Sequence, residues 1–375
     1  MKKILVVSHT YVTPMNQRKL QAMARCGFDV YLLTPSVVKD TLREIHLEVL
    51  AGAKFKVFPV RSYFGIHNSL RIYNSSDIRK ALNEIRPDFV LVEQEPYSLS
   101  TFQVMREKKT FGFKTLLFTF QNIFKNYPFP FSTIESKNLK LADLLIVGND
   151  DALSVWKKKG MPADKIVVLP QVGVDFDEFF AKDNLEAKAV FGLKNFVVGY
   201  AGRFVEEKGL SVLIKAMSYL EDLPLTLVLA GRGPYKAQLV SEIQSLGLSE
   251  KIKFIEGLTH EQMPSLMNAL DIFVLPSLAR KHWREQFGHV LIEAMACGVP
   301  CIGTETDPID VVIGDGGLTF KMGDALDLAK KIRHAFEVPT DLKLYSQHAI
   351  KRVEQHYTND SIAKQLDRLT DNLGH

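Results

Sequence analysis

Short apolar segments alternate with helix-length amphipathic segments along almost all of this 375-residue chain, and this alternation constrains the fold more than any other feature. The apolar segments are rich in β-branched residues, which is typical of strands buried on both faces of a parallel sheet. The predicted strands are residues 4–8, 30–34, 55–60, 89–93, 114–119, 144–147 and 166–169 in the first half, and 196–201, 226–230, 253–256, 272–276, 300–303 and 318–320 in the second.

Helices are expected between these strands. The predicted helices are residues 17–26, 77–85, 98–108, 150–159, 210–220, 235–246, 261–270, 290–297 and 324–336, with two more in 346–373 that part near 357–359. Alternating strands and helices imply parallel sheets covered on both faces. Residues 171–195 interrupt the alternation with polar, turn-like sequence. The sequence therefore predicts an α/β fold of two Rossmann-like, doubly wound domains, 1–170 and 171–356, facing across a cleft.

Composition narrows the class of protein. Apolar residues make up 46% of the chain and charged residues 24%, which is typical of a folded globular protein and not of a disordered, collagen-like or coiled-coil chain. Uncharged apolar runs such as 196–202 and 223–231 are far shorter than the roughly 20 residues of a membrane-spanning helix. The apolar stretch 4–7 is too short for a signal peptide, and three cysteines provide no disulfide framework. We expect a cytoplasmic protein.

The net charge of +4 is unevenly distributed, with +10 in residues 1–170 and −6 in residues 171–375. A basic half suggests an anionic partner, although chance asymmetry of solvated side chains is the alternative. Residues 111–131 contain seven of the 24 phenylalanines. Together these features suggest an anionic membrane surface carrying a lipid-linked acceptor, whereas core packing is the alternative for Phe113, Phe118 and Phe120.

Two glutamates eight residues apart define the strongest motif, Glu285-Gln-Phe-Gly-His-Val-Leu-Ile-Glu293. A helix is expected to begin near 287–288, and its free N–H groups would suit a phosphate. Glu285 would lie in the preceding loop, and Glu293 two turns inside the helix. Because an acid is costly to bury without a partner or a purpose, Glu293 is either a ligand-binding group or a salt-bridged structural acid.

Two glycine turns follow predicted strands in the same half. Gly202-Arg203 precedes Lys208-Gly209, and the two cations would suit a diphosphate clamp, since Arg offers a planar fork and Lys a mobile charge. Two surface cations near a turn are the alternative. The second turn, Gly231-Arg-Gly233-Pro, lacks the third glycine of a dinucleotide fingerprint. A tight turn between strand and helix is the favoured explanation of this motif.

These motifs, with Leu169-Pro-Gln-Val-Gly-Val-Asp175 and residues 310–320, resemble the retaining glycosyltransferases of family 4, also called glycosyl transferases group 1. The resemblance is specific over residues 165–320 and looser over the N-terminal half. It implies the GT-B architecture, with a final helix, about 357–375, returning to the first domain. It also implies that residues 171–356 bind a nucleotide-sugar donor and that residues 1–170 receive the acceptor.

The resemblance assigns roles to individual residues. Arg203 and Lys208 would stabilise the departing diphosphate, and Glu285 would contact the donor sugar; these three are the expected catalytic residues. Glu293 would bond the ribose, and Gly257-Leu258 would lie beside the base. The other donor-binding residues implied are Gly202, Gly231, Phe287, Gly288, His289 and Val290. No metal or other cofactor is implied, because cations and a helix dipole take its place.

The N-terminal half departs from the family pattern where the acceptor is expected. Asn16 lies in a segment that replaces a Gly-Gly loop, and Gln121-Asn122 replaces a His that follows a middle strand. These three residues, together with His9 and Tyr97 after neighbouring strands, are the acceptor-side candidates. Each is equally explained as a loop polar group whose hydrogen bonds are satisfied within the fold.

The expected function is retaining transfer of a hexose-type sugar from a nucleotide-diphosphate sugar, UDP favoured over GDP, to a hydroxyl of a glycan or glycolipid. Cell-surface polysaccharide or glycolipid biosynthesis is the expected setting, at the inner face of a membrane if the protein is peripheral. A nucleotide-sugar epimerase or hydrolase, or a non-catalytic sugar-binding protein, is the alternative. No nucleic-acid partner is expected.

Overall fold

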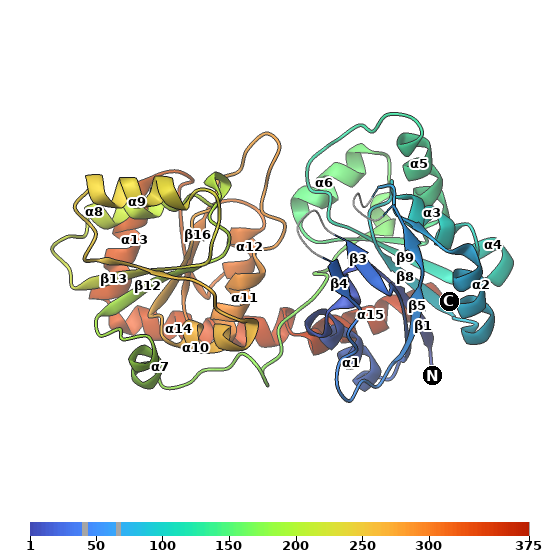
Figure 1. The fold of residues 1–375 in the computed structure, drawn as a ribbon, viewed down its shortest axis with the longest axis horizontal. Helices are drawn as coiled ribbons and strands as arrows, with labels where there is room; N and C mark the ends of the chain where they lie inside the picture. The colour runs from blue at the N-terminus through green and yellow to red at the C-terminus, as the bar shows by residue number, and fades with distance from the viewer. Residues whose placement is uncertain (40–43, 65–68, 375) are drawn as a thin grey trace. The chain divides into compact units, whose positions relative to one another are not determined.

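The chain, a computed structural model described over residues 1–39, 44–64 and 69–374, forms two compact units, each built around its own parallel sheet (Figure 1). Unit 1 comprises Met1–Gly173 and Asn359–His375, and unit 2 comprises Val174–Thr358. The last helix therefore belongs to the unit that the first half of the chain builds.

A seven-stranded sheet forms the centre of unit 1, in the order β11-β10-β9-β8-β1-β2-β5. Its strands are β1 (Lys3–Val7), β2 (Asp29–Pro35), β5 (Lys56–Val60), β8 (Phe89–Glu93), β9 (Lys114–Thr119), β10 (Leu144–Val147) and β11 (Ile166–Val168). All neighbouring pairs are parallel. Two short antiparallel pairs lie outside this sheet: β3 (Val37–Lys39) with β4 (Glu44–His46), and β6 (Ser62–Tyr63) with β7 (Ile72–Tyr73).

Helices cover both faces of the unit 1 sheet, because successive side chains of a strand point to opposite faces. Leu5 and Val7 of β1 pack in a core with α2 (Ser75–Ile85), α3 (Leu99–Met105) and α6 (Asp150–Lys158). Ile4 and Val6 pack on the other face with α1 (Arg18–Arg25) and α15 (Asn359–Gly374). The remaining helical segments are α4 (Lys108–Phe111), α5 (Phe131–Leu141), η1 (Thr10–Val12), η2 (Pro14–Gln17) and η3 (Ala163–Lys165).

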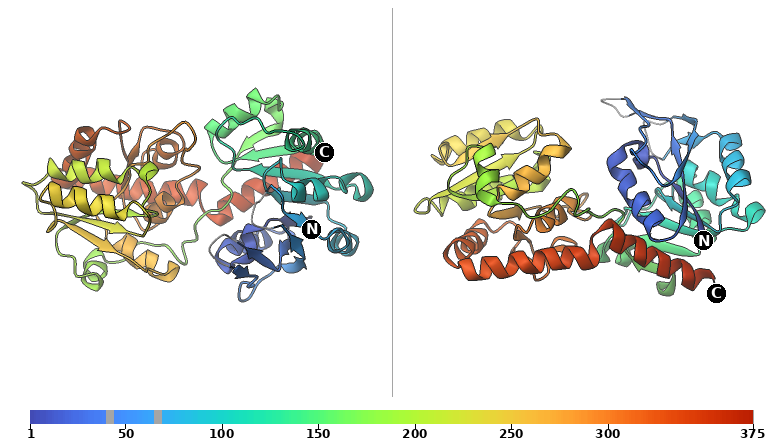
Figure 2. Two further views of the ribbon diagram at one scale, coloured as in Figure 1. Left: turned by 45° about the horizontal axis from the view of Figure 1, so that its top comes forward. Right: turned by 90° about the horizontal axis from the view of Figure 1, so that it is seen from below.

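A six-stranded parallel sheet forms the centre of unit 2, in the order β14-β13-β12-β15-β16-β17. Its strands are β12 (Phe196–Ala201), β13 (Leu225–Ala230), β14 (Ile252–Ile255), β15 (Ile272–Leu275), β16 (Cys301–Thr304) and β17 (Gly317–Phe320). The views show α8 and α9 on one side of this sheet and α10 and α14 on the other (Figures 1 and 2).

The helices of unit 2 vary from single turns to 18 residues. They are α7 (Asn184–Val190), η4 (Glu206–Lys208), α8 (Leu210–Ser218), α9 (Lys236–Ser245), η5 (His260–Gln262), α10 (Met263–Asn268), α11 (His289–Ala296), α12 (Ile309–Ile313), α13 (Ala325–Glu337) and α14 (Pro339–His356). Within the described ranges 1–39, 44–64 and 69–374, no helix combines the length and apolarity needed to cross a membrane.

All thirteen predicted strands are confirmed with bounds shifted by at most one residue, but several helices differ from the prediction. The predicted helix 98–108 is two helices, α3 and α4, and 261–270 begins as the single turn η5. The first tail helix begins at Pro339, not near 346, since a proline fits the first turn of a helix. Three short helices, α5, α7 and α12, were not predicted.

Candidate active site

A pocket of about 540 Å³ opens in unit 2 beyond the carboxyl ends of β12 and β13, the edge at which doubly wound sheets bind ligands. Its lining residues are Ala201, Gly202, Arg203, Ala230, Gly231, Arg232, Gly257, Leu258, Met263, Val290 and Glu293. Seven of them are residues that the sequence singled out: Gly202, Arg203, Gly231, Gly257, Leu258, Val290 and Glu293. The structure therefore gathers these residues around one space, from segments far apart in the chain.

Two glycines let the turns beside this pocket approach each other. Gly231 has φ +138°, and a Cβ there would lie 1.9 Å from the carbonyl oxygen of Gly202. Gly202 has φ +151°, and a Cβ there would lie 2.8 Å from the hydroxyl oxygen of Tyr200. Both positions therefore require glycine. The second glycine motif is thus a tight turn and part of the pocket wall at once.

Lys208 and Glu285 form an ion pair in which Nζ lies 2.5 Å from Oε2. Ser277, just beyond the end of β15, donates its hydroxyl to the same oxygen at 3.0 Å. The two charged side chains are only 14% and 13% exposed, so water screens the pair less than it screens a surface pair. Gly209, with φ +67°, turns the chain immediately after Lys208 into α8. The structure thus joins two of the three predicted catalytic residues directly.

Arg203, the third predicted catalytic residue, is exposed at the rim of the pocket. Its backbone carbonyl accepts a hydrogen bond of 2.9 Å from the buried hydroxyl of Tyr200. Burial raises the pKa of Tyr200 well above its ordinary value of 10.0, and the negative charge of Glu285 raises it further. Tyr200 therefore stays protonated as a donor and connects the Arg203 turn with the surroundings of Glu285.

Glu293 projects from the first part of α11, whose N-cap is Gly288 with φ +74°. It is the fifth residue of the helix and so lies about one turn inside, not the two turns predicted, since a turn takes 3.6 residues. Its carboxylate Oε1 lies 3.1 Å from Nδ1 of His289. This contact supplies a partner for an acid that is 9% exposed, while the acid also lines the pocket.

The other predicted donor-side residues divide into two kinds. Val290, Gly257 and Leu258 line the pocket. Phe287 instead packs against the hydrophobic core of unit 2, with its ring centroid 5.6 Å from that of Tyr357. Its side chain is therefore structural, and its backbone leads to Gly288 and His289 at the start of α11.

His9 and Asn16 lie in the connection between β1 and α1. The side-chain amide of Asn16 donates to the carbonyl of Thr10 at 2.6 Å. Burial, and secondly the positive charge of Arg71, lower the pKa of His9 from 6.5 to about 4. The His9 imidazole is therefore neutral at pH 7.

Tyr97 and Gln121 share a neighbour, Tyr127. The rings of Tyr97 and Tyr127 lie 4.1 Å apart, and the Tyr127 hydroxyl donates to Gln121 Oε1 at 3.4 Å. The Gln121 amide also donates to the carbonyl of Ile123 at 3.0 Å, and Asn122 is buried. The acceptor-side candidates thus form two groups, one after β1 and one after β8 and β9. Asn16 and Gln121 make the internal hydrogen bonds of the alternative interpretation.

Sequence reasoning missed three residues at or beside the unit 2 site: Ser277, Arg232 and Met263. The position of Ser277 just after a predicted strand was an available signal. Arg232 lies inside a quoted motif, whereas Met263 carries no signal of its own.

In residues 1–39, 44–64 and 69–374, no group of three or more His, Cys, Asp or Glu side chains is placed to hold a metal ion.

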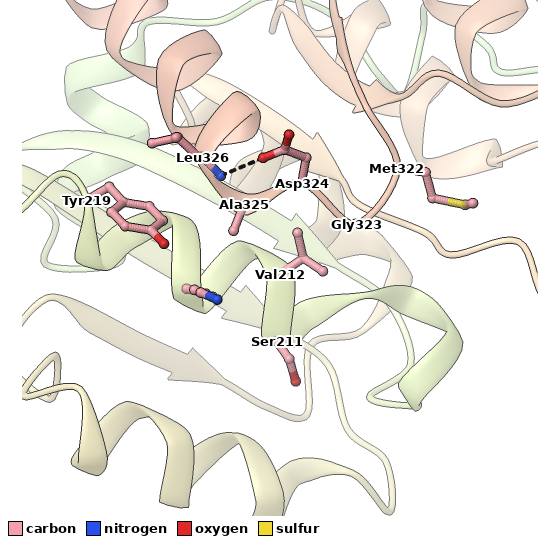
Figure 3. Close-up of a pocket in the computed structure, with 9 residues that line it drawn as sticks. Ser211, Val212, Tyr219, Met322, Gly323, Asp324, Ala325 and Leu326 are labelled. Atoms are coloured by element: carbon pink, nitrogen blue, oxygen red, sulfur yellow. Dashed lines mark hydrogen bonds between the residues drawn. The ribbon is translucent and has the colours of Figure 1, made fainter.

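A second pocket of about 560 Å³ lies between α8 and the loop that leads into α13 (Figure 3). Lys215 lines it from α8 and Tyr219 from the C-cap of that helix, and Met322 and Leu326 line it from the other side. Asp324 is occupied in capping α13, since its carboxylate accepts from the backbone N–H of Leu326 at 3.0 Å. All predicted site residues lie in the described part of the chain, and none of them lines this pocket.

The fold matches solved structures over nearly the whole chain. The chain matches sucrose-phosphate synthase from Thermosynechococcus elongatus with a TM-score of 0.74 and 19% identity, over 100% of this chain and 99% of that one. It matches Anabaena HepE in complex with UDP with a TM-score of 0.73 and 19% identity, over 99% and 100% of the two chains. The chain therefore has the GT-B fold of glycosyltransferases, as the sequence predicted.

The family match lies within unit 2. Residues 181–352 match the family "Glycosyl transferases group 1". Over 198 residues the chain is 32% identical to the D-inositol 3-phosphate glycosyltransferase of Mycobacterium tuberculosis strain H37Rv. That alignment covers 50% of this chain and 39% of the relative, so the chain spans about two fifths of the length of the curated relatives it matches.

Proposed function

We propose that the protein is a retaining glycosyltransferase that moves a hexose-type sugar from a nucleotide-diphosphate sugar to a hydroxyl of a glycan or glycolipid. The observation that carries the proposal is the unit 2 pocket, which places Arg203, the Gly231 turn and Glu293 around one space beside the start of α11. A helix start and a cation suit a diphosphate. UDP is favoured over GDP, and the fold neighbour HepE is known in complex with UDP and with UDP-glucose.

In the proposed reaction, the bond between the anomeric carbon and the diphosphate breaks while the acceptor oxygen bonds to that carbon on the same face. The acceptor proton passes to the departing phosphate oxygen. Charge grows on this phosphate as the bond breaks, so Arg203 and Lys208 stabilise the transition state more than the ground state. Glu285 accepts hydrogen bonds from the sugar, and Glu293 accepts them from the ribose.

We propose that two cations and a helix start perform the task that a metal ion performs in other transferases. Activity is then unchanged by excess EDTA. A preparation that loses activity with EDTA and regains it with Mg²⁺ or Mn²⁺ would contradict this part of the proposal. The contribution of each cation is measured separately in variants of Arg203 and Lys208.

The test of the function begins with donor binding. A thermal-shift series with UDP-, GDP-, ADP- and dTDP-sugars identifies the nucleotide, because a ligand that binds only the folded protein raises the melting temperature. The stabilising donor, radiolabelled in its sugar, is then incubated with glycan and lipid extracts. Nuclear magnetic resonance of the product reports the anomeric configuration, and retention is the expected result.

The same experiment separates the alternatives. An epimerase or hydrolase would convert the donor without an acceptor and release free sugar or an isomerised sugar nucleotide. A sugar-binding protein would bind sugar independently of nucleotide and without turnover. Either result would overturn the proposal.

We also propose a cytoplasmic protein that meets a lipid-linked acceptor at the inner face of the membrane, in cell-surface polysaccharide or glycolipid assembly. Phe113 and Phe118 are buried, as the packing alternative predicted, but Phe124 and Phe129 are 46% and 83% exposed. Lys125 between them is also exposed. Exposed aromatic and basic residues together suit an anionic membrane surface.

Sedimentation with vesicles tests this partner. The protein is expected to sediment with phosphatidylglycerol-containing vesicles more than with phosphatidylcholine vesicles, and the double variant Phe124→Ala/Phe129→Ala is expected to lose most of this binding. Leu185→Ala/Val190→Ala is the matched control, since these apolar side chains of unit 2 are 74% and 72% exposed. Equal binding by both double variants would contradict the proposed surface.

A further inference from the structure

A four-residue turn, Arg280 to Trp283, lies immediately before Glu285 and is not used in the function proposed above. The backbone N–H of Arg280 donates to the carbonyl of Trp283 at 2.7 Å, and the N–H of Trp283 donates back to the carbonyl of Arg280 at 3.3 Å. These reciprocal bonds close the turn and fix the direction in which the indole ring leaves the backbone.

The turn is fastened to the segment that carries Lys208. The backbone N–H of Leu278, just before the turn, donates to the carbonyl of Glu207 at 2.7 Å. The guanidinium of Arg280 lies 2.8 Å from the carboxylate of Glu206. This ion pair is exposed and so contributes little stability, but both contacts hold the turn against η4.

The indole ring of Trp283 covers the ammonium of Lys208. The Nζ atom lies 5.3 Å from the ring centroid and 2.5 Å from Glu285 Oε2. A cation at this distance is attracted to the negative face of an indole ring. A lysine side chain carries about 2 kcal/mol of rotamer entropy, so the ring and the carboxylate together restrict where the ammonium can be.

We propose that Trp283 is a positioning residue that holds Lys208 where the donor diphosphate meets it. The inference rests on the function proposed above and extends it to a side chain with no role there. Without donor, Lys208 is shared by Trp283 and Glu285. When a diphosphate binds, Lys208 exchanges Glu285 for phosphate oxygens and keeps its contact with the ring. Glu285 then becomes available to the hydroxyls of the sugar.

Variants of Trp283 test this role through Lys208. Trp283→Ala is expected to lower kcat/KM for the donor about tenfold, whereas Trp283→Phe, which keeps an aromatic face, stays within about threefold of wild type. His282→Ala, an exposed neighbour in the same turn, is the control and leaves kcat/KM unchanged. In a Lys208→Ala background, Trp283→Ala is expected to cost less than twofold, because the ring then has no ammonium to hold.

Fluorescence supplies a second readout. The chain has two tryptophans, and Trp156 is fully buried in unit 1. UDP is expected to change the emission of the wild-type protein and to leave that of Trp283→Phe unchanged. If Trp283→Ala costs the same factor with and without Lys208, or Trp283→Phe shows the wild-type emission change, the positioning role is overturned while the proposed function stands. A wild-type protein that neither binds nor consumes any nucleotide sugar would overturn both.

Discussion

Lys208 Nζ lies 2.5 Å from Glu285 Oε2, so the two groups on which the proposed chemistry depends neutralise each other in this structure. Each is the other's ion-pair partner, and we expect donor binding to rearrange this pair. Binding and activity are therefore expected to respond in opposite ways when Glu285 loses its charge, and to fall together when Lys208 is removed.

Glu285→Gln is expected to lower kcat for transfer at least 100-fold while UDP binds with the same affinity or up to about tenfold more tightly. The reason is that Lys208 no longer exchanges a carboxylate for the phosphate, while the sugar loses a charged acceptor. Calorimetric titration with UDP and steady-state kinetics measure the two effects. Glu250→Gln, exposed in the connection from α9 to β14 at the opposite edge of the sheet, is the control. Near-normal turnover in Glu285→Gln would refute the assigned role.

Lys208→Ala is expected to weaken UDP binding by about 10- to 100-fold and to abolish most transfer, because the departing diphosphate loses a cation. The fold is expected to stay intact, since Ser277 still donates to Glu285. Circular dichroism checks the fold, and titration with UDP checks affinity. Lys215→Ala, an exposed lysine on α8 beside the second pocket, is expected to bind UDP normally. Equal affinities in the two variants would remove Lys208 from the site.

Gly231→Ala is expected to lower the free energy of unfolding by several kcal/mol and to impair nucleotide binding, because its Cβ would lie 1.9 Å from a backbone oxygen of Gly202. Gly247→Ala is the matched control. It also has positive φ, +68°, but its Cβ would meet no atom within 4 Å, so only about 1 kcal/mol of backbone strain is expected. Thermal denaturation measures both. A Gly231→Ala protein as stable as Gly247→Ala would show that the turns can separate freely.

His9 is expected to make unit 1 less stable in mild acid. Its pKa falls from 6.5 to about 4 on folding, so between these values the unfolded chain binds more protons and stability rises with pH. Lowering the pH from 7 to 5 therefore costs about 2 kcal/mol through this residue. His9→Asn is expected to show a smaller loss of melting temperature between pH 7 and pH 5 than wild type. An identical loss in both proteins would contradict the buried neutral imidazole.

The strands were predictable because burial on both faces leaves a continuous apolar run, as at 89–93 and 144–147. Several helices depend on contacts that sequence does not reveal. Helix α5 follows two prolines, and its Asn138 is buried because its amide donates to the carbonyl of Pro96 at 2.7 Å. Helix α7 carried a readable signal, since Asp183 caps it by accepting from the backbone N–H of Glu186.

The site was predictable from the sequence where the backbone conformation allows only one residue type. Gly231 must be glycine because a Cβ there would overlap the backbone of Gly202, and a Cβ on Gly202 would meet the hydroxyl of Tyr200. The glycines in the two motifs therefore indicate the geometry of the turns. The pairing of Lys208 with Glu285 joins residues 77 apart, and no local pattern indicates it. The ring of Trp283 lies over Lys208 in a turn that is tied to η4, and this long-range contact also has no local pattern.

Helix α15 has a consequence for the order in which the chain folds. Ile362, Ala363 and Leu366 fill the core beneath one face of the unit 1 sheet, and Lys2 holds Asp367 at 2.7 Å. On the ribosome, unit 2 is complete once residue 358 has emerged. Unit 1 lacks part of its core until α15 follows, although its first 173 residues were made earlier. The part of the protein synthesised first is therefore expected to be the last to become stable.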